Sequence, residues 1–311
     1  MIKKIILFCL GFCALGTTLN GQTQTLPILG MGNDMRSAGM AGVNPVYSLQ
    51  GNLYSSPTSL LYGTDKGIRL SYQIGFHHTT DANSVTYHQA SAGYRLGQLR
   101  GVYLGWRYLG GTEVPYVNAM GITRGMIHPR DWAVELGYTR LFGEAFSGWG
   151  RVGYLQSYNS VTADVVTASL GADYRCRGFY DDFGDCMLSL SVENFGSNVK
   201  YAKSAESFKQ PTLARLEGSV SFLKDRNLTL GAGARYLFTG NDNKKMIYNF
   251  GGEYRPGKLI SLRSGYTLSP YGNVLSLGLG IGYKGFLLDG AYDKHEVKEF
   301  NMIRLGITWA L

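Results

Sequence analysis

The sequence predicts an all-β protein, a transmembrane antiparallel β-barrel of about fourteen strands with an N-terminal hatch in the lumen. Its 311 residues include 43 Gly, 22 Tyr and 14 Phe but only 17% charged residues, a composition typical of many glycine-rich, aromatic strands. From Ile68 onward, apolar and polar residues alternate with period two in one segment after another. Tight turns and longer loops alternate between these segments, as they do in bacterial outer-membrane barrels.

The N-terminus has the features of a secretory signal. Lys3 and Lys4 precede an apolar stretch from Ile5 to Leu15, and small and polar residues follow. We therefore expect residues 1–21 to be a signal peptide, residues 22–66 the hatch or plug segment, and residues 67–311 the barrel. This export route predicts a location in the outer membrane of a Gram-negative bacterium.

The strand pattern is clearest in residues 275–283, where Leu, Ile and Tyr share one face and Ser and Gly share the other. Most such segments are close to the length of a tilted strand that crosses a bilayer. A soluble β-sandwich is the alternative, but its strands would not keep a lipid-length apolar face on nearly every hairpin. The expected strands begin near Ile68, Ser84, Arg100, Asp131, Gly148, Asp164, Gly184, Ala214, Asn227, Met246, Lys258, Val274, Phe286 and Asn301.

The connections predict the orientation. Residues 223–226, 255–258 and 284–285 form tight turns after even-numbered strands, whereas the two longest loops, 110–130 and 195–213, follow odd-numbered strands. Short periplasmic turns and longer external loops are the rule in these barrels, so the N-terminal and C-terminal ends of the barrel's chain should both lie in the periplasm.

The C-terminus resembles the assembly signal that the outer-membrane insertion machinery reads. Its spaced residues are Arg304, Gly306, Trp309 and Leu311, with Leu311 in place of the usual terminal aromatic residue. The partners expected from this signal and from the apolar outer face are the barrel-assembly machinery, outer-membrane lipid and lipopolysaccharide.

The alternation of side chains with a period of two also predicts a charged lumen. Buried charges need partners, so we expect the inward charges to pair with one another; a ring that selects ions or substrates is the alternative. The net charge of +8 does not indicate nucleic-acid binding, because Arg and Lys are scattered singly among the strands. The expected inward polar residues are Arg69, Gln89, Arg107, Glu135, Asp173, Glu193, Glu217, Arg235, Glu253, Arg263 and Arg304.

Many other inward positions are glycine, among them Gly75, Gly137, Gly251, Gly265 and Gly278. Glycine weakens a strand unless something approaches its backbone closely, and a barrel of this size is too wide for its own side chains to fill. The segment from Leu26 to Lys66, with helix-compatible pieces at 35–40 and 58–62, is the candidate filler. We expect it to form a hatch.

A motif within this segment resembles the start of FadL-like barrels, and in particular of the PorV/PorQ group of Bacteroidetes. The resemblance implies a component of type IX protein secretion or surface attachment, with secreted cargo proteins or other secretion components as partners. A FadL-like channel for hydrophobic small molecules is the alternative. The motif residues are Arg36, Ala38, Gly39, Met40 and Gly42, followed by Asn52, Pro57 and Leu60.

Motifs for chemistry are weak. The sequence has no zinc, phosphate-loop or nucleotide fingerprint, so we expect no cofactor and no enzymatic activity. A barrel-rim hydrolase is a third alternative, because His77 and His78 precede Asp81 and Ser84. Nothing in the sequence supplies an oxyanion donor beside them.

Cys176 and Cys186 flank the turn 177–185 and each continues the apolar face of its strand. If the two strands pair directly, their β-carbons should lie about 4.5–5.5 Å apart, close to the separation in a disulfide. An oxidising periplasm favours that bridge over two free, lipid-facing thiols.

Overall fold

The computed structural model describes residues 26–46, 53–62, 67–77, 85–111, 113–117, 120–179, 184–201, 207–238, 245–257, 259–296 and 300–311. The expected signal peptide, residues 1–21, and Asn52 of the hatch motif lie outside these ranges.

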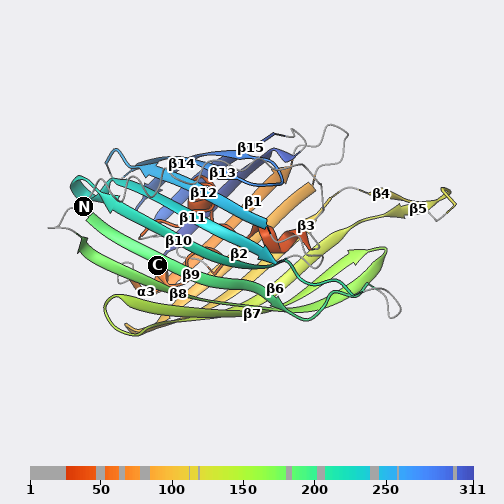
Figure 1. The fold of residues 1–311 in the computed structure, drawn as a ribbon, viewed down its shortest axis with the longest axis horizontal. Helices are drawn as coiled ribbons and strands as arrows, with labels where there is room; N and C mark the ends of the chain where they lie inside the picture. Colours follow the sequence, from red (N-terminus) through yellow and green to blue (C-terminus); the bar gives the residue numbers. More distant parts are fainter. Residues whose placement is uncertain are drawn as a thin grey trace.

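Fourteen antiparallel strands form one closed barrel (Figure 1). Barrel strands that follow one another in the sequence lie side by side in the wall, and β6 follows β3 because β4 and β5 form a separate sheet. Pairing of β1 with β16 closes the barrel. The predicted antiparallel barrel of about fourteen strands is confirmed, and each strand begins within a few residues of its expected start. The strands are β1 (Ile68–His77), β2 (Val85–Leu96), β3 (Arg100–Gly110), β6 (Arg130–Leu141), β7 (Phe146–Asn159), β8 (Val161–Phe179), β9 (Gly184–Gly196), β10 (Thr212–Phe222), β11 (Leu228–Phe238), β12 (Lys245–Tyr254), β13 (Ile260–Leu268), β14 (Val274–Tyr283), β15 (Phe286–His295) and β16 (Met302–Ala310).

A separate two-stranded hairpin, β4 (Val114–Val117) and β5 (Thr123–Ile127), lies within the region expected to be a loop. It extends past the end of the barrel wall (Figure 1). The period-two pattern did not reveal these strands, because they are four and five residues long and their pairing shifts at Tyr116/Val117. Its apolar side chains are exposed, including Met120 at 82% and Ile122 at 54%.

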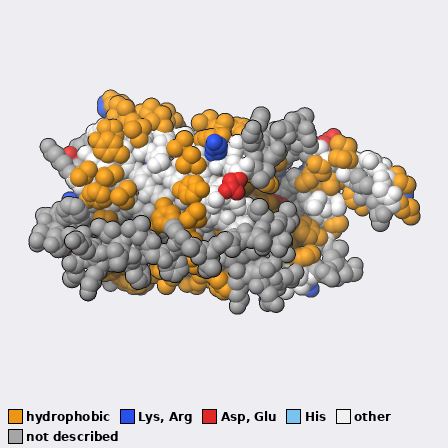
Figure 2. Space-filling model, turned by 45° about the horizontal axis from the view of Figure 1, so that its top comes forward, with side chains coloured by type: hydrophobic (Ala, Val, Ile, Leu, Met, Phe, Trp, Pro, Cys, Tyr) orange, Lys and Arg blue, Asp and Glu red, His pale blue; other side chains and the backbone are white. Residues whose placement is uncertain are grey.

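The outer face of the barrel is apolar. On β14, for example, Leu277, Leu279 and Ile281 are exposed, whereas Ser276 on the opposite face is buried. Figure 2 shows hydrophobic side chains over much of the described surface and few charged ones. Among the described residues, no helix is long and apolar enough to cross a membrane.

The described N-terminal residues form three short helical turns: η1 (Pro27–Met31), α2 (Met35–Ala38) and α3 (Ser59–Tyr62). The last two coincide with the predicted helix-compatible pieces. The Asp34 side chain caps α2 by accepting a hydrogen bond from the Ser37 backbone N–H at 2.7 Å. A further 3-10 turn, η2 (Lys224–Arg226), connects β10 and β11.

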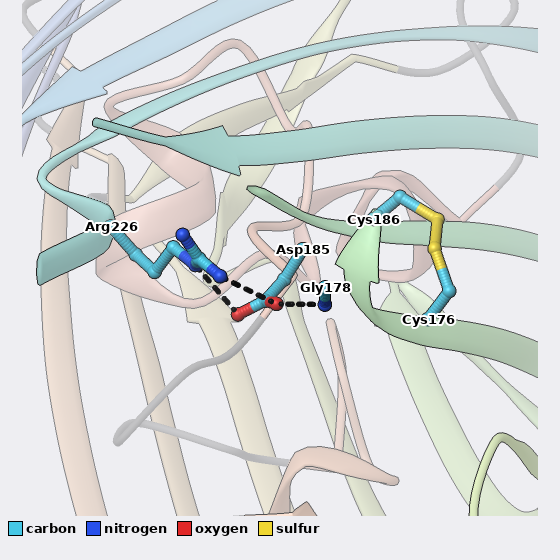
Figure 3. Close-up of a disulfide and its surroundings, with 5 residues drawn as sticks. All are labelled: Cys176, Gly178, Asp185, Cys186 and Arg226. Atoms are coloured by element: carbon cyan, nitrogen blue, oxygen red, sulfur yellow. Dashed lines mark hydrogen bonds and ion pairs between the residues drawn. A yellow bond between two sulfur atoms is a disulfide. The ribbon is translucent and has the colours of Figure 1, made fainter. Parts of the chain in front are cut away.

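Cys176 of β8 lies opposite Cys186 of β9, and a disulfide joins them with their Cα atoms 5.2 Å apart (Figure 3). Beside it, the carboxylate of Asp185 accepts hydrogen bonds from the Gly178 backbone N–H and from Arg226 Nε, at 3.1 and 3.2 Å. The bridge and this carboxylate together join the β8–β9 end of the wall to the β10–β11 turn.

We predict that mass spectrometry of the unreduced protein will find Cys176 and Cys186 linked. Replacing both by serine should lower the free energy of unfolding by about 2–3 kcal/mol at most, because the bridge closes only a short loop. Alkylation of both thiols without prior reduction would contradict this prediction.

Candidate functional site in the barrel interior

The N-terminal segment, described at 26–46 and 53–62, lies against inward-facing glycines of the wall. A Cβ atom added to Gly265 of β13 would lie 2.5 Å from the backbone of Met40, and one added to Gly278 of β14 would lie 2.9 Å from the Cα atom of Gly39. These approaches leave no room for a side chain on the wall. Other inward glycines that face this segment are Gly101, Gly105, Gly137, Gly231, Gly251 and Gly306.

A chain of buried ion pairs joins this segment to the wall. Arg36 of α2 donates a hydrogen bond from Nε to Glu253 of β12 at 2.7 Å. Glu253 also accepts from Arg263 of β13 at 2.7 Å, and Arg263 in turn pairs with Asp289 of β15 at 2.5 Å. Since buried charges are stable only when paired, Arg36 completes a network that three wall strands begin.

Polar wall side chains also donate hydrogen bonds to backbone carbonyls of the segment. Arg107 donates to the carbonyl of Ile28 at 3.0 Å, and Arg175 donates to that of Val46 at 2.9 Å. Further donors of this kind are Gln73, Tyr103, Arg151, Asn194, Arg235 and Asn249. Irregular backbone has carbonyls that no sheet satisfies, so these donors supply the missing partners.

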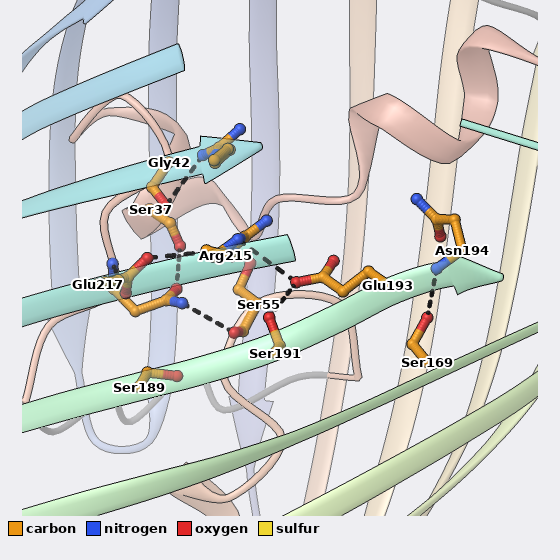
Figure 4. Close-up of polar contacts among 12 residues, drawn as sticks. Ser37, Gly42, Ser55, Ser169, Ser189, Ser191, Glu193, Asn194, Arg215 and Glu217 are labelled. Carbon is orange, nitrogen blue, oxygen red and sulfur yellow. Dashed lines mark hydrogen bonds and ion pairs between the residues drawn. The ribbon is translucent and has the colours of Figure 1, made fainter. Parts of the chain in front are cut away.

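Strands β9 and β10 show a similar arrangement (Figure 4). Glu217 of β10 accepts a hydrogen bond from the backbone N–H of Asn44 at 2.7 Å. Arg215 pairs with Glu193 at 3.4 Å and lies 4.0 Å from Glu217. Here a carboxylate accepts from the backbone of the segment, whereas Glu253 accepts from its Arg36 side chain and wall guanidinium groups donate to its carbonyls.

Burial perturbs two titratable groups of the segment. Desolvation raises the pKa of Asp34 above its ordinary value, although hydrogen bonds from Ser37 oppose the shift. Desolvation also raises the pKa of the Tyr54 phenol, with the Glu135 carboxylate adding to the shift. The guanidinium carbon of Arg107 lies over the Tyr54 ring, 4.7 Å from the centroid of that ring, and the Tyr54 phenol stays neutral.

The interior is not uniformly polar. An apolar cluster forms between η1 and the wall. Its wall residues come from β2, β3, β6, β7, β8 and β16, at the end of the barrel away from the disulfide. The alternation pattern predicted a charged lumen, and it did not predict that apolar side chains would gather inside the barrel around the segment. The cluster comprises Leu26, Ile28, Leu29, Tyr87, Leu109, Ala133, Leu155, Ala163, Val165, Val199 and Met302.

The residues predicted for the lumen network are brought together only in part. Arg107 pairs with Glu135 at 2.7 Å, as an inward network requires. Glu253 pairs with Arg263 as well as with Arg36 of the N-terminal segment. Glu217 and Arg235 hydrogen-bond to the segment, and Arg304 pairs with Asp293. Arg69 is buried. Period two would also have found five interacting residues that we did not name: Arg151, Arg175, Arg215, Asp289 and Asp293.

The described residues of the predicted hatch motif all lie in the interior. Ala38 packs with Met35 and Ala291, and Leu60 is fully buried beside Tyr103. The carbonyl of Pro57 accepts a hydrogen bond from Tyr103 at 2.8 Å. Whether the segment closes a passage stays a prediction.

The proposed assembly signal and rim hydrolase are not tested. Gly306 faces Met35, Trp309 stacks on Phe286 with centroids 5.3 Å apart, and Leu311 pairs with Ile68 through the backbone. His77 ends β1, but its expected partners His78, Asp81 and Ser84 lie outside the described residues. Within the described part of the chain, no group of three His, Cys, Asp or Glu residues is placed to hold a metal ion.

Comparison with solved structures identifies similar barrels. The Pseudomonas putida toluene transporter TodX aligns with a TM-score of 0.59 and 11% identity, over 92% of this chain and 98% of TodX. The monoaromatic hydrocarbon channel CymD has a TM-score of 0.57 and 12% identity, over 93% of this chain and 99% of CymD. A FadL homologue of Pseudomonas aeruginosa has a TM-score of 0.51 and 10% identity, over 94% and 99%.

These similarities establish the fold: a barrel like those of FadL-type outer-membrane proteins of Gram-negative bacteria. These neighbours are transporters and channels rather than enzymes. No model of a known protein family matches the sequence, and no curated protein is significantly similar to it.

We predict that Gly265→Ala will unseat the N-terminal segment, because the new methyl group would collide with the Met40 backbone. The cost should be about 1–3 kcal/mol, typical of overpacking. Limited proteolysis should then cleave the segment faster while the barrel stays folded. Gly290→Ala is the matched control, since its Cβ would lie 3.7 Å from the Leu305 side chain, an ordinary contact. Equal cleavage in both variants would contradict the prediction.

Proposed function

We propose that this protein is an outer-membrane channel for small hydrophobic molecules, in which the N-terminal segment acts as the hatch. One observation supports the proposal: the barrel has a fold like that of TodX, and the described part of its N-terminal segment packs against inward glycines of the wall. A polar, water-filled pore would need neither the N-terminal segment nor the apolar cluster around η1.

The distribution of apolar residues inside the barrel supports this proposal. A hydrophobic solute entering at the end that carries Tyr87 and Leu109 would meet the apolar cluster before the charged middle of the lumen. TodX and CymD are described as carrying toluene and monoaromatic hydrocarbons, which are solutes of this kind. The paired charges around Arg263 would hold the segment while a solute binds beside it.

The test is influx of a fluorescent hydrophobic probe, N-phenyl-1-naphthylamine, into Gram-negative cells that express the protein. We expect faster influx than in cells with an empty vector, because lipopolysaccharide is the barrier to such compounds. Deleting residues 26–62 should leave an insertable barrel whose conductance in planar bilayers is severalfold higher. Influx no faster than in the empty-vector cells would refute the channel, and unchanged conductance would refute the hatch.

A second candidate is a component of type IX secretion of the PorV/PorQ kind in Bacteroidetes. The observation that favours it is the β4–β5 hairpin, whose apolar side chains include Tyr116, Met120, Ile122 and Met126 and are exposed. A two-stranded hairpin is marginally stable alone, and exposed apolar patches often mark protein-binding surfaces. Secreted proteins or other secretion components would be its partners.

This candidate predicts that Met120→Ser with Ile122→Ser will reduce the surface attachment of secreted proteins in the native host. Removing two exposed apolar side chains should weaken such an interface without unfolding the barrel. The measurement is the ratio of each secreted protein on cells to that in the medium. Thr123→Ser on the same hairpin is the control, and an unchanged ratio in the double variant would rule out this role.

A further inference from the structure

Two arginines face each other on the outer, apolar side of the barrel wall. Arg100 begins β3 and Arg140 lies next to the end of β6, and the register of the wall places them directly opposite one another. Alternation puts both on the same face as the exposed Leu104 and Leu136, and both arginines are themselves exposed. The β-carbons of directly opposed residues lie about 4.5–5.5 Å apart, so two positive charges are held close together.

The neighbouring strands supply no carboxylate for these charges. Along the same row of the wall, Leu96 of β2 is opposite Arg100, and Gly148 of β7 is opposite Arg140. Within the described part of the chain, neither arginine has an ion pair or a side-chain hydrogen bond. Like charges directly opposite one another destabilise a pair of strands. The row therefore calls for an anion that this part of the chain does not provide.

Aromatic side chains position the guanidinium group of Arg140. Its central carbon lies over the Phe142 ring, 5.5 Å from the centroid of that ring, and the rings of Phe142 and Phe146 are 6.0 Å apart. Phe142 covers Gly148, since a Cβ atom added to this glycine would lie 3.2 Å from Phe142 Cε2. The glycine and the two rings therefore keep the Arg140 guanidinium at the edge of the wall, beside Arg100.

An apolar lane runs along the wall from these arginines toward the middle of the barrel. Val102 and Tyr138 form the next outward pair, and Leu104 and Leu136 form the pair after it. Because the outer face of a membrane barrel contacts lipid tails, charged residues at the end of the lane lie where the hydrocarbon meets the headgroups. A phospholipid has the same order of groups, a phosphate followed by acyl chains.

We propose that Arg100 and Arg140 bind the phosphate of an anionic phospholipid, phosphatidylglycerol, whose acyl chains run along Leu104 and Leu136. Guanidinium groups bind phosphate oxygens through charge-assisted hydrogen bonds, and one phosphate can bridge two of them. Phosphatidylcholine carries its own ammonium group, which the paired arginines would repel. The site lies at the end of the barrel with the tight turns, which faces the inner leaflet in the predicted orientation. It lies outside the lumen, so it is independent of the proposed channel function.

Native mass spectrometry tests this site on the full-length protein in a neutral detergent with equal amounts of phosphatidylglycerol, phosphatidylcholine and lipid A. The two phospholipids carry the same acyl chains. We expect the wild type to retain phosphatidylglycerol about tenfold more often than phosphatidylcholine, as a charge-assisted hydrogen bond allows. Arg100→Gln with Arg140→Gln should abolish that preference. Arg124→Gln with Lys284→Gln removes the same charge from two exposed positions elsewhere and should leave the preference unchanged.

Leu96→Glu tests the same site with both arginines intact. Its carboxylate would lie opposite Arg100 and supply the missing anion, so retention of phosphatidylglycerol should fall to that of phosphatidylcholine. In detergent without lipid, this variant should melt no lower than the wild type, because it relieves the repulsion between the arginines. Equal retention of the two phospholipids by the wild type, an unchanged preference in Leu96→Glu, or preferential retention of lipid A would overturn the proposal.

Discussion

The structure depends on the requirement that charges inside the barrel be paired away from bulk water. Arg36, Glu253, Arg263 and Asp289 satisfy one another across α2 and three wall strands. Removing one member would leave a buried charge without its partner, which typically costs about 3–5 kcal/mol. The N-terminal segment is thus part of the electrostatic balance of the wall.

The glycines of the wall leave the space that the N-terminal segment occupies. Glycine at positions 265 and 278 lets the segment's backbone reach the sheet, close enough for wall side chains such as Arg107 and Asn249 to donate to its carbonyls. Packing and hydrogen bonding are coupled here, because a displaced segment would lose both.

The interior also has a chemical gradient along the strands. Charged pairs occupy the middle of the barrel, whereas the apolar cluster around η1 lies toward the end that His77 and Met302 border.

The sequence by itself determined the barrel, its number of strands and which polar residues face the lumen, because side chains alternate between the two faces of a strand with a period of two. Its inward glycines also indicated that something approaches the wall. Only the tertiary structure decided which charges meet, since partners such as Arg36 and Glu253 are 217 residues apart and the register of closure brings them together. It also revealed the β4–β5 hairpin, because strands of four and five residues carry too little alternation to be recognised in the sequence.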